Sequence, residues 1–202
     1  MKRKSILTIV LFLTVVGLSF PQTKTVENIK EAIKGETTAS AKYKAYAEKA
    51  KEEGYDKIAL LFEAASKAES IHAGNHRAVL NQLGEEMEDF EPEFTVNSTK
   101  ENLQDAIDGE SYEVATMYPN FLKAAKNDNV NLASISFNYA YQTEQKHAEL
   151  YKNALAQLNA GQENSLASIY YVCTTCGNTY DNEAPERCGI SMTPKERFVT
   201  IQ

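Results

Sequence analysis

An internal repeat constrains the fold of this chain more than any other feature. Residues 25–36 read TVENIKEAIKGE and residues 99–110 read TKENLQDAIDGE, at an offset of 74 positions. A second similarity links Glu69-Ser-Ile-His72 to Glu144-Gln-Lys-His147, at an offset of 75. A repeated unit of this length predicts two copies of one supersecondary structure that share a core.

Apolar residues in both halves recur at intervals of three and four, which predicts amphipathic helices. Short breaks fall at 53–55 and 127–129, and a long acidic stretch with one proline spans 84–98. Two short connections on either side of a long one favour a ferritin-like four-helix bundle over a simple up-and-down bundle. We therefore predict an all-α bundle over residues 24–160, followed by a linker and a small domain at 168–202.

The N-terminus has a different composition from the rest of the chain. Lys2, Arg3 and Lys4 precede an apolar run of about 15 residues, which is shorter than the roughly 20 that a membrane span needs. This pattern predicts a signal peptide over residues 1–19, and an uncleaved anchor is the alternative. We expect an exported protein of the periplasm or cell envelope, with no membrane attachment after cleavage.

The net charge limits the choice of partners. The chain carries a formal charge of -7, and removal of the three basic N-terminal residues would leave -7 - 3 = -10. An acidic protein of this kind is a poor ligand for nucleic acid or anionic membranes. We expect no nucleic-acid partner.

The repeated acidic residues are spaced so that they meet inside the bundle. Glu36 lies 18 residues before Gly54, and Glu69 lies 15 residues after it. At a rise of about 1.5 Å per residue, an antiparallel hairpin brings both to nearly the same height. The second half has similar spacing around Asp128. The residues expected at this level are Glu36, Glu69, Glu110 and Glu144, with His72 and His147 one turn further along.

A group of buried carboxylates needs compensation. An unpaired buried charge costs several kcal/mol, and neighbouring carboxylates also repel one another. Two divalent cations would offset this charge, and carboxylate and imidazole ligands suit iron or manganese. The alternative is a helical bundle whose glutamates and histidines face solvent. Two copies of the pattern in register favour the metal site.

These motifs resemble those of the rubrerythrin family over residues 25–160. That family has Gly-Glu on the first and third helices and Glu-x-x-His on the second and fourth. The resemblance implies a di-iron site, in which Glu113 corresponds to an additional glutamate that exchanges with a histidine when the redox state changes. The implied metal ligands are Glu36, Glu69, His72, Glu110, Glu113, Glu144 and His147.

Two tyrosines and a third histidine belong to the same region. Tyr43 and Tyr118 resemble family tyrosines that hydrogen-bond metal-bound glutamates, which would add them to the catalytic site. The alternative is that both are ordinary core tyrosines. His76 lies one turn beyond His72, and we expect it to be a satisfied core histidine or a partner of a ligand rather than a ligand itself.

The C-terminal segment resembles the rubredoxin-like tail of the same family, with one departure. Such a tail has two Cys-x-x-Cys motifs that hold one iron ion. Cys173 and Cys176 form the first motif and Cys188 opens the second, but Ser191 stands where the fourth cysteine is expected. We expect a third iron or a zinc ion at the three cysteines. A disulfide between Cys173 and Cys176, with Cys188 free, is the alternative in an oxidising compartment.

The resemblance implies a non-haem di-iron oxidoreductase that reduces hydrogen peroxide to water in defence against oxidative stress. Electrons would come through the cysteine-bound iron or from an outside donor protein, in an NAD(P)H-linked or rubredoxin-linked reaction. A homodimer is also implied. Two alternatives remain open: an iron-binding protein of the ferroxidase or sequestration type without sustained turnover, and a structural metal bundle without redox chemistry.

Overall fold

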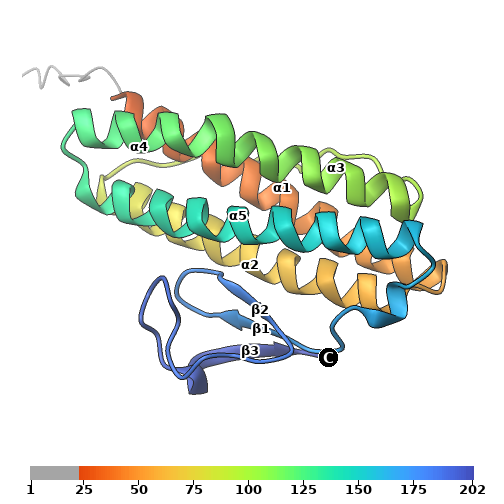
Figure 1. Cartoon of the computed structure of the whole chain (residues 1–202). Coiled ribbons are helices and arrows are strands. Elements are labelled where there is room, and N and C mark those ends of the chain that lie inside the picture. Colours follow the sequence, from red (N-terminus) through yellow and green to blue (C-terminus); the bar gives the residue numbers. More distant parts are fainter. Residues whose placement is uncertain (1–22) are drawn as a thin grey trace, which may run out of the picture.

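The computed structural model describes residues 23–202 (Figure 1). The predicted signal peptide at 1–19 lies outside the described residues. Three rods of the bundle are continuous helices: α1 (Lys24–Glu52), α2 (Asp56–Gln82) and α5 (Asn131–Asn159). The fourth rod consists of α3 (Thr99–Tyr112), the π-helix η1 (Glu113–Met117) and α4 (Tyr118–Asn127).

The connections confirm the predicted ferritin-like bundle. A short turn with Gly54 at φ 85° joins α1 to α2, and another with Asn129 at φ 58° joins α4 to α5. The segment 83–98 runs back along the bundle, so that α3 starts at the opposite end from where α2 finishes (Figure 1). A capping box between Ser98 and Glu101 fixes the start of α3.

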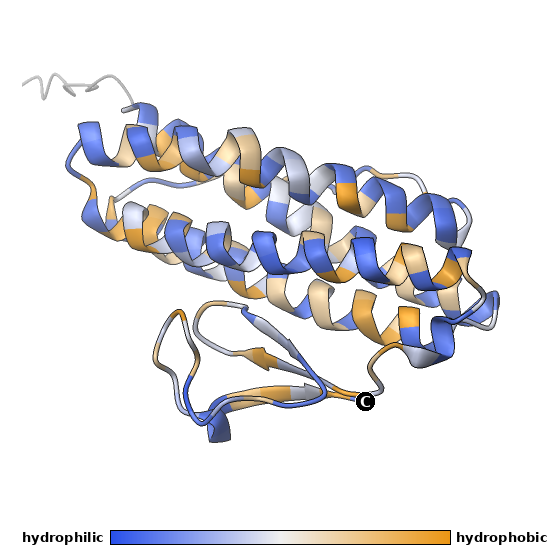
Figure 2. Ribbon diagram, viewed as in Figure 1, coloured by the Kyte–Doolittle hydropathy of each residue, from blue (hydrophilic) through white to orange (hydrophobic). Residues whose placement is uncertain are grey.

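The bundle interior has two apolar clusters. The first lies toward the α1–α2 turn and contains Phe62, Tyr46 and Tyr151; the second contains Ile29 and Phe137. Hydrophilic residues cover much of the side of α5 that faces the viewer in Figure 2. Apolar packing therefore holds the four rods together on the inside, as the helical periodicity predicts.

The π-helix η1 adds one residue to the fourth rod. Glu36 and Tyr43 on α1 are seven positions apart, whereas the equivalent Glu110 and Tyr118 are eight apart. A π-turn absorbs an extra residue, so that both side chains still point into the bundle. Pro119 directly follows Tyr118; it has no N–H to donate, so a wider turn suits this position. The repeat offset changes from 74 to 75 at this insertion.

The C-terminal domain is a three-stranded antiparallel sheet beneath α2 and α5 (Figure 1). Its strands are β1 (Tyr170–Cys173), β2 (Thr179–Asp181) and β3 (Phe198–Ile201), in the order β2-β1-β3. The short 3-10 helix η2 (Glu163–Ser165) precedes β1 in the sequence, and the 3-10 helix η3 (Lys195–Arg197) directly precedes β3. Lys57 of α2 donates to the carbonyls of Asn164 and Leu166 at 2.6 and 2.9 Å, which ties the linker to the bundle. Within residues 23–202, no helix has both the length and the apolar character to cross a membrane.

The first prediction concerns the apolar cluster near the α1–α2 turn. Phe62 is fully buried, and its ring centroid lies 5.3 Å from that of Tyr151 and 5.4 Å from that of Tyr46. We expect Phe62→Ala to lower the free energy of unfolding of the metal-free protein by about 3–5 kcal/mol, because it leaves a cavity. Urea denaturation measures this loss. Leu132→Ala, at a residue that is 48% exposed, is the control and should change stability by less than about 0.5 kcal/mol.

Candidate metal centre

Six of the predicted ligands meet at one level of the bundle interior. Each rod contributes: α1 and α3 one glutamate each, α2 and α5 a glutamate and a histidine each. None of the six is more than 2% exposed. The structure thus brings together Glu36, Glu69, His72, Glu110, Glu144 and His147.

These residues form two groups that share two carboxylates. One group adds Glu36 and His72 to the shared Glu69 and Glu144, and the other adds Glu110 and His147 to the same pair. In each group the ligand atoms lie within 4.8 Å of one another. Two neighbouring cations would each find four ligands here, with Glu69 and Glu144 available to both.

The lone pairs of this cluster converge without forming hydrogen bonds. The Nδ1 of His72 lies 2.8 Å from oxygens of both Glu69 and Glu144, and the Nδ1 of His147 lies 2.8 Å from Glu144 and 3.1 Å from Glu69. Both oxygens of each shared glutamate and both Nδ1 atoms are buried without a hydrogen-bond partner. Buried polar atoms normally find partners, so this cluster needs positive charge among its atoms, from bound ions or from protons. Its oxygen and nitrogen donors fit iron or manganese.

Burial and mutual charge shift the pKa values of these groups in the metal-free protein. Burial raises the pKa of Glu36 to about 8. Burial also acts to raise the pKa of Glu69, but His147 and His72 outweigh it and lower that pKa to about 2. The pKa values of His72 and His147 are raised well above the usual range, because the attraction of the neighbouring glutamates exceeds the opposing effect of burial. Protons therefore supply the positive charge that bound cations would otherwise provide.

The C-terminal domain orients both histidines. The Nε2 of His72 donates to the backbone carbonyl of Cys176, and the Nε2 of His147 donates to the Oγ1 of Thr179, each at 2.9 Å. Each bond holds the ring proton at Nε2 and so fixes the tautomer of the neutral histidine. The lone pair of Nδ1 then points into the centre, where it can bind a metal ion. Gly177 makes this approach possible, because a Cβ there would overlap the Nε2 of His72.

Two tyrosines link two neighbouring rods of the bundle reciprocally. Tyr43 of α1 donates to Glu110 of the fourth rod at 2.7 Å, and Tyr118 of the fourth rod donates to Glu36 of α1. Both hydroxyls therefore contact predicted ligands, as the family resemblance implies. Each bond occupies one carboxylate oxygen and restricts how its glutamate can turn.

His76 lies outside both ligand groups. Its Nε2 lies 3.2 Å from the hydroxyl of Tyr118 and its Nδ1 lies 2.7 Å from the Oγ of Ser136. Tyr118 donates its only hydroxyl proton to Glu36, so its oxygen accepts from the Nε2–H of His76. The Nδ1 of the neutral ring then accepts from the hydroxyl of Ser136. Burial and the nearby charge of His72 lower the pKa of His76 to about 3. A neutral imidazole in this chain of hydrogen bonds supports the position of Tyr118.

Glu113 also lies outside both groups, at the start of η1. It is half-buried, unlike the six fully buried residues. Burial raises its pKa well above the usual range, and Glu36 adds more to this shift than any other carboxylate. Its role as a ligand stays a prediction.

Comparison with known proteins decides the family. The family profile described as rubrerythrin matches residues 27–155. This chain belongs to the rubrerythrin family. Members of the family carry a di-iron site and act as oxidoreductases. The ligand groups described above have the composition that such a site requires.

Several rubrerythrin relatives align over most of the chain. Nigerythrin from Nitratidesulfovibrio vulgaris is 37% identical over 177 residues, which cover 86% of this chain and 85% of the relative. Rubrerythrin-2 from Clostridium acetobutylicum is 31% identical over 185 residues, covering 90% and 98%. The fully reduced, all-ferrous structure of nigerythrin superposes with a TM-score of 0.79 at 34% identity, covering 99% of this chain and all of that one. Symerythrin from Cyanophora paradoxa, with a TM-score of 0.62 at 23% identity over 69% of this chain and 88% of that one, shares the fold.

The three cysteines form a separate buried cluster in the rubredoxin-like domain. Cys173, Cys176 and Cys188 are free thiols, and their sulfur atoms lie within 4.8 Å of one another. This cluster can hold another metal ion, as the sequence predicts. The disulfide alternative is not the arrangement in this structure.

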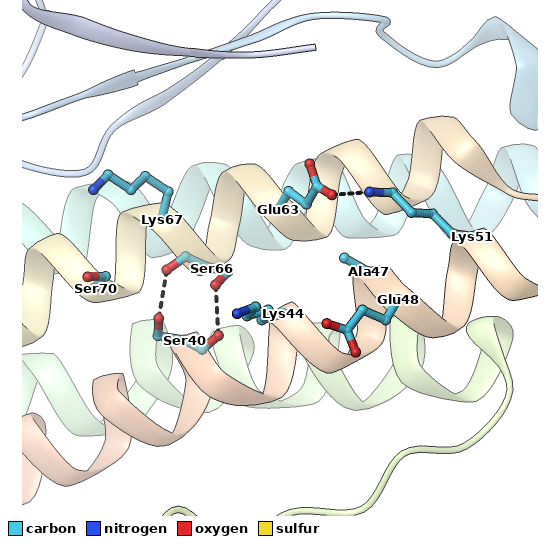
Figure 3. A pocket seen from close by; sticks show the side chains of 9 residues that line it. All are labelled: Ser40, Lys44, Ala47, Glu48, Lys51, Glu63, Ser66, Lys67 and Ser70. Carbon is cyan, nitrogen blue, oxygen red and sulfur yellow. Dashed lines mark hydrogen bonds and ion pairs between the residues drawn. The ribbon is translucent and has the colours of Figure 1, made fainter.

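The groove shown in Figure 3 lies on the outer surface between α1 and α2, away from the metal-ligand groups. Across it, the Oγ of Ser40 donates to the carbonyl of Ser66 at 2.9 Å, and the Oγ of Ser66 donates to the carbonyl of Ser40 at 2.8 Å. These reciprocal bonds hold the two helices together about one turn from Glu36 and Glu69. The groove therefore marks a close contact between α1 and α2.

Metal binding should depend on pH. In the metal-free protein Glu36 is protonated below about pH 8, and His72 and His147 retain protons above their usual range. Cations must displace these protons, so affinity should rise from pH 6 to pH 8, by roughly tenfold per pH unit for each proton displaced. Titration with Mn²⁺ at several pH values, together with proton release into weak buffer, measures this. A pH-independent affinity without proton release would contradict the assignment.

A glycine pair tests whether the C-terminal domain supports the centre. Gly177 has φ +79°, and an added Cβ would collide with His72; Gly161 has φ +66° and open space around it. We expect Gly177→Ala to weaken Mn²⁺ binding about 10–100-fold, the usual effect of losing a partner of a metal-binding histidine. Gly161→Ala carries the same backbone strain and should leave binding unchanged. Equal effects of both variants would show that backbone strain alone is responsible.

Proposed function

We propose that this protein is a di-iron peroxidase that reduces hydrogen peroxide to water. One observation carries the proposal: two ligand groups that share Glu69 and Glu144 place two metal positions side by side in a buried site. Two adjacent ions can contact both oxygens of a peroxide. The reaction consumes one hydrogen peroxide, two electrons and two protons, and it forms two water molecules.

The protein residues would hold the site rather than perform the redox step. When bound, the two iron ions supply the two electrons that cleave the O–O bond. Glu69 and Glu144 fix the two positions relative to each other, and Tyr43 and Tyr118 fix the remaining glutamates. Burial excludes bulk water from the centre, which limits release of reactive intermediates.

Glu113 and His72 are the residues that we expect to exchange. His72 belongs to the ligand group that contains Glu36, whereas Glu113, at the start of η1, is outside both groups. The half-buried Glu113 is also the most exposed of the seven predicted ligands. We place the entry of peroxide beside Glu113, because the other six ligands are covered on all sides.

The electrons would return by one of two routes. The cysteine cluster is joined to His72 through the Cys176 carbonyl, which offers a path within this chain. An outside donor protein, in an NAD(P)H-linked or rubredoxin-linked reaction, is the other route. We expect a homodimer in the periplasm or cell envelope, on the basis of the family resemblance and the N-terminal sequence.

Steady-state turnover tests the function. With excess peroxide and a reductant, the iron-loaded protein should consume many equivalents of peroxide per chain. Glu144→Ala should lose one metal ion and at least about 100-fold in turnover, because it removes a shared ligand. Glu149→Ala, at an exposed glutamate of the same helix, is the control and should retain both.

Two outcomes would reject the proposal. A single round of iron oxidation that then stops would favour an iron-sequestering or ferroxidase-type protein. Unchanged metal content in both Glu69→Ala and Glu144→Ala would remove the ligand assignment itself.

A further inference from the structure

Four side chains of the C-terminal domain converge on one point. The Sγ of Cys173 lies 3.2 Å from the Oγ of Ser191, and the Sγ of Cys176 lies 3.4 Å from the Sγ of Cys188. A tetrahedral ion with metal–sulfur bonds of about 2.3 Å separates its sulfur ligands by about 3.8 Å. The sulfur-to-sulfur distance of 3.4 Å is a few tenths of an ångström shorter than this, and the sulfur-to-oxygen distance of 3.2 Å is likewise shorter than the about 3.5 Å expected with a metal–oxygen bond of about 2.0 Å, so a small expansion would admit an ion.

The backbone around Ser191 has the same turn as the backbone around Cys176. Cys173 opens a turn that is closed by a 2.9 Å bond from the N–H of Gly177 to its carbonyl. Cys188 opens a matching turn, closed by a 3.0 Å bond from the N–H of Met192. Both closing residues have positive φ, 79° and 59°. Cys176 and Ser191 are each the third residue after the opening cysteine, so the two turns present their side chains equivalently.

The hydroxyl of Ser191 is held with its lone pairs available. Thr193 donates its own proton to the Oγ1 of Thr175 at 2.7 Å. Thr193 is therefore the acceptor in the 2.8 Å contact with the Oγ of Ser191, which donates. With its proton directed to Thr193, the Ser191 oxygen can offer a lone pair to an ion without losing that proton.

We propose that Cys173, Cys176, Cys188 and Ser191 form a tetrahedral metal site with three thiolate ligands and one oxygen ligand. The site would take a divalent ion that favours sulfur, such as Zn²⁺ or Fe²⁺. Thr193 is a positioning residue that orients the Ser191 hydroxyl. Oxygen is a harder ligand than thiolate, so this site should hold its ion less firmly than four thiolates would.

Cobalt(II) is a suitable probe, because only thiolate ligation gives intense sulfur-to-metal charge-transfer absorption in the near ultraviolet. This band separates the cysteine site from the carboxylate–histidine centre of the bundle. Full-length protein with reduced thiols should develop the band and saturate it at one Co²⁺ per chain. Ser191→Cys should increase the band intensity by about a third, since four thiolates replace three.

Loss of the oxygen ligand gives the decisive comparison. Ser191→Ala should weaken Co²⁺ binding at this site about 10–100-fold and shift the visible ligand-field bands. Thr193→Val should have a smaller effect in the same direction, and Ser168→Ala, at an exposed serine of the same domain, should have none.

Three results would overturn the proposal. The first is unchanged affinity and ligand-field bands in Ser191→Ala, which would show that another group completes the site. The second is absence of the charge-transfer band in the reduced wild-type protein. The third is an unchanged band in Ser191→Cys, which serves as the test if Ser191→Ala fails to fold.

Discussion

The structure depends on compensation of the negative charge of Glu69 and Glu144, the two glutamates that belong to both ligand groups. Both carboxylates are buried, and neither has a hydrogen-bond partner for either oxygen. A protein interior tolerates such groups only with nearby positive charge, and this bundle offers two protonated histidines or two cations. The surrounding apolar clusters are thus arranged around a polar layer that is incomplete without bound charge. Stability and metal affinity are coupled for that reason.

The two halves of the bundle are nearly equivalent, and their differences distinguish the two metal positions. Tyr43 and Tyr118 make reciprocal bonds, but only Tyr118 also accepts a hydrogen bond from His76. The residue equivalent to His76 in the second half is Tyr151, whose buried hydroxyl has no hydrogen-bond partner. One metal position therefore has a richer set of nearby polar groups than the other.

The C-terminal domain affects the bundle through contacts as well as through any electrons it carries. The sulfur of Cys176 is part of the cysteine cluster, and its backbone carbonyl accepts a hydrogen bond from His72 of the bundle. An ion that ordered the cysteine loops would also order the hydrogen-bond partner of this histidine. Such coupling acts equally in both directions, so filling of the bundle centre would also favour the docked domain.

The sequence by itself determined the helical bundle, its connections and the level at which the repeated acids and histidines meet. Helical periodicity and a fixed rise per residue are local properties, so spacing around Gly54 and Asp128 sufficed. The change of offset from 74 to 75 also contained the signal of the π-turn, which the spacing argument did not use. Only the tertiary structure decided the tyrosine pairing, the position of Glu113 outside the ligand groups, and the bonds from Cys176 and Thr179 to the histidines. Those contacts join residues that are distant in the chain. Every residue has a backbone carbonyl, so the residue type at position 176 could not show that this carbonyl accepts from His72.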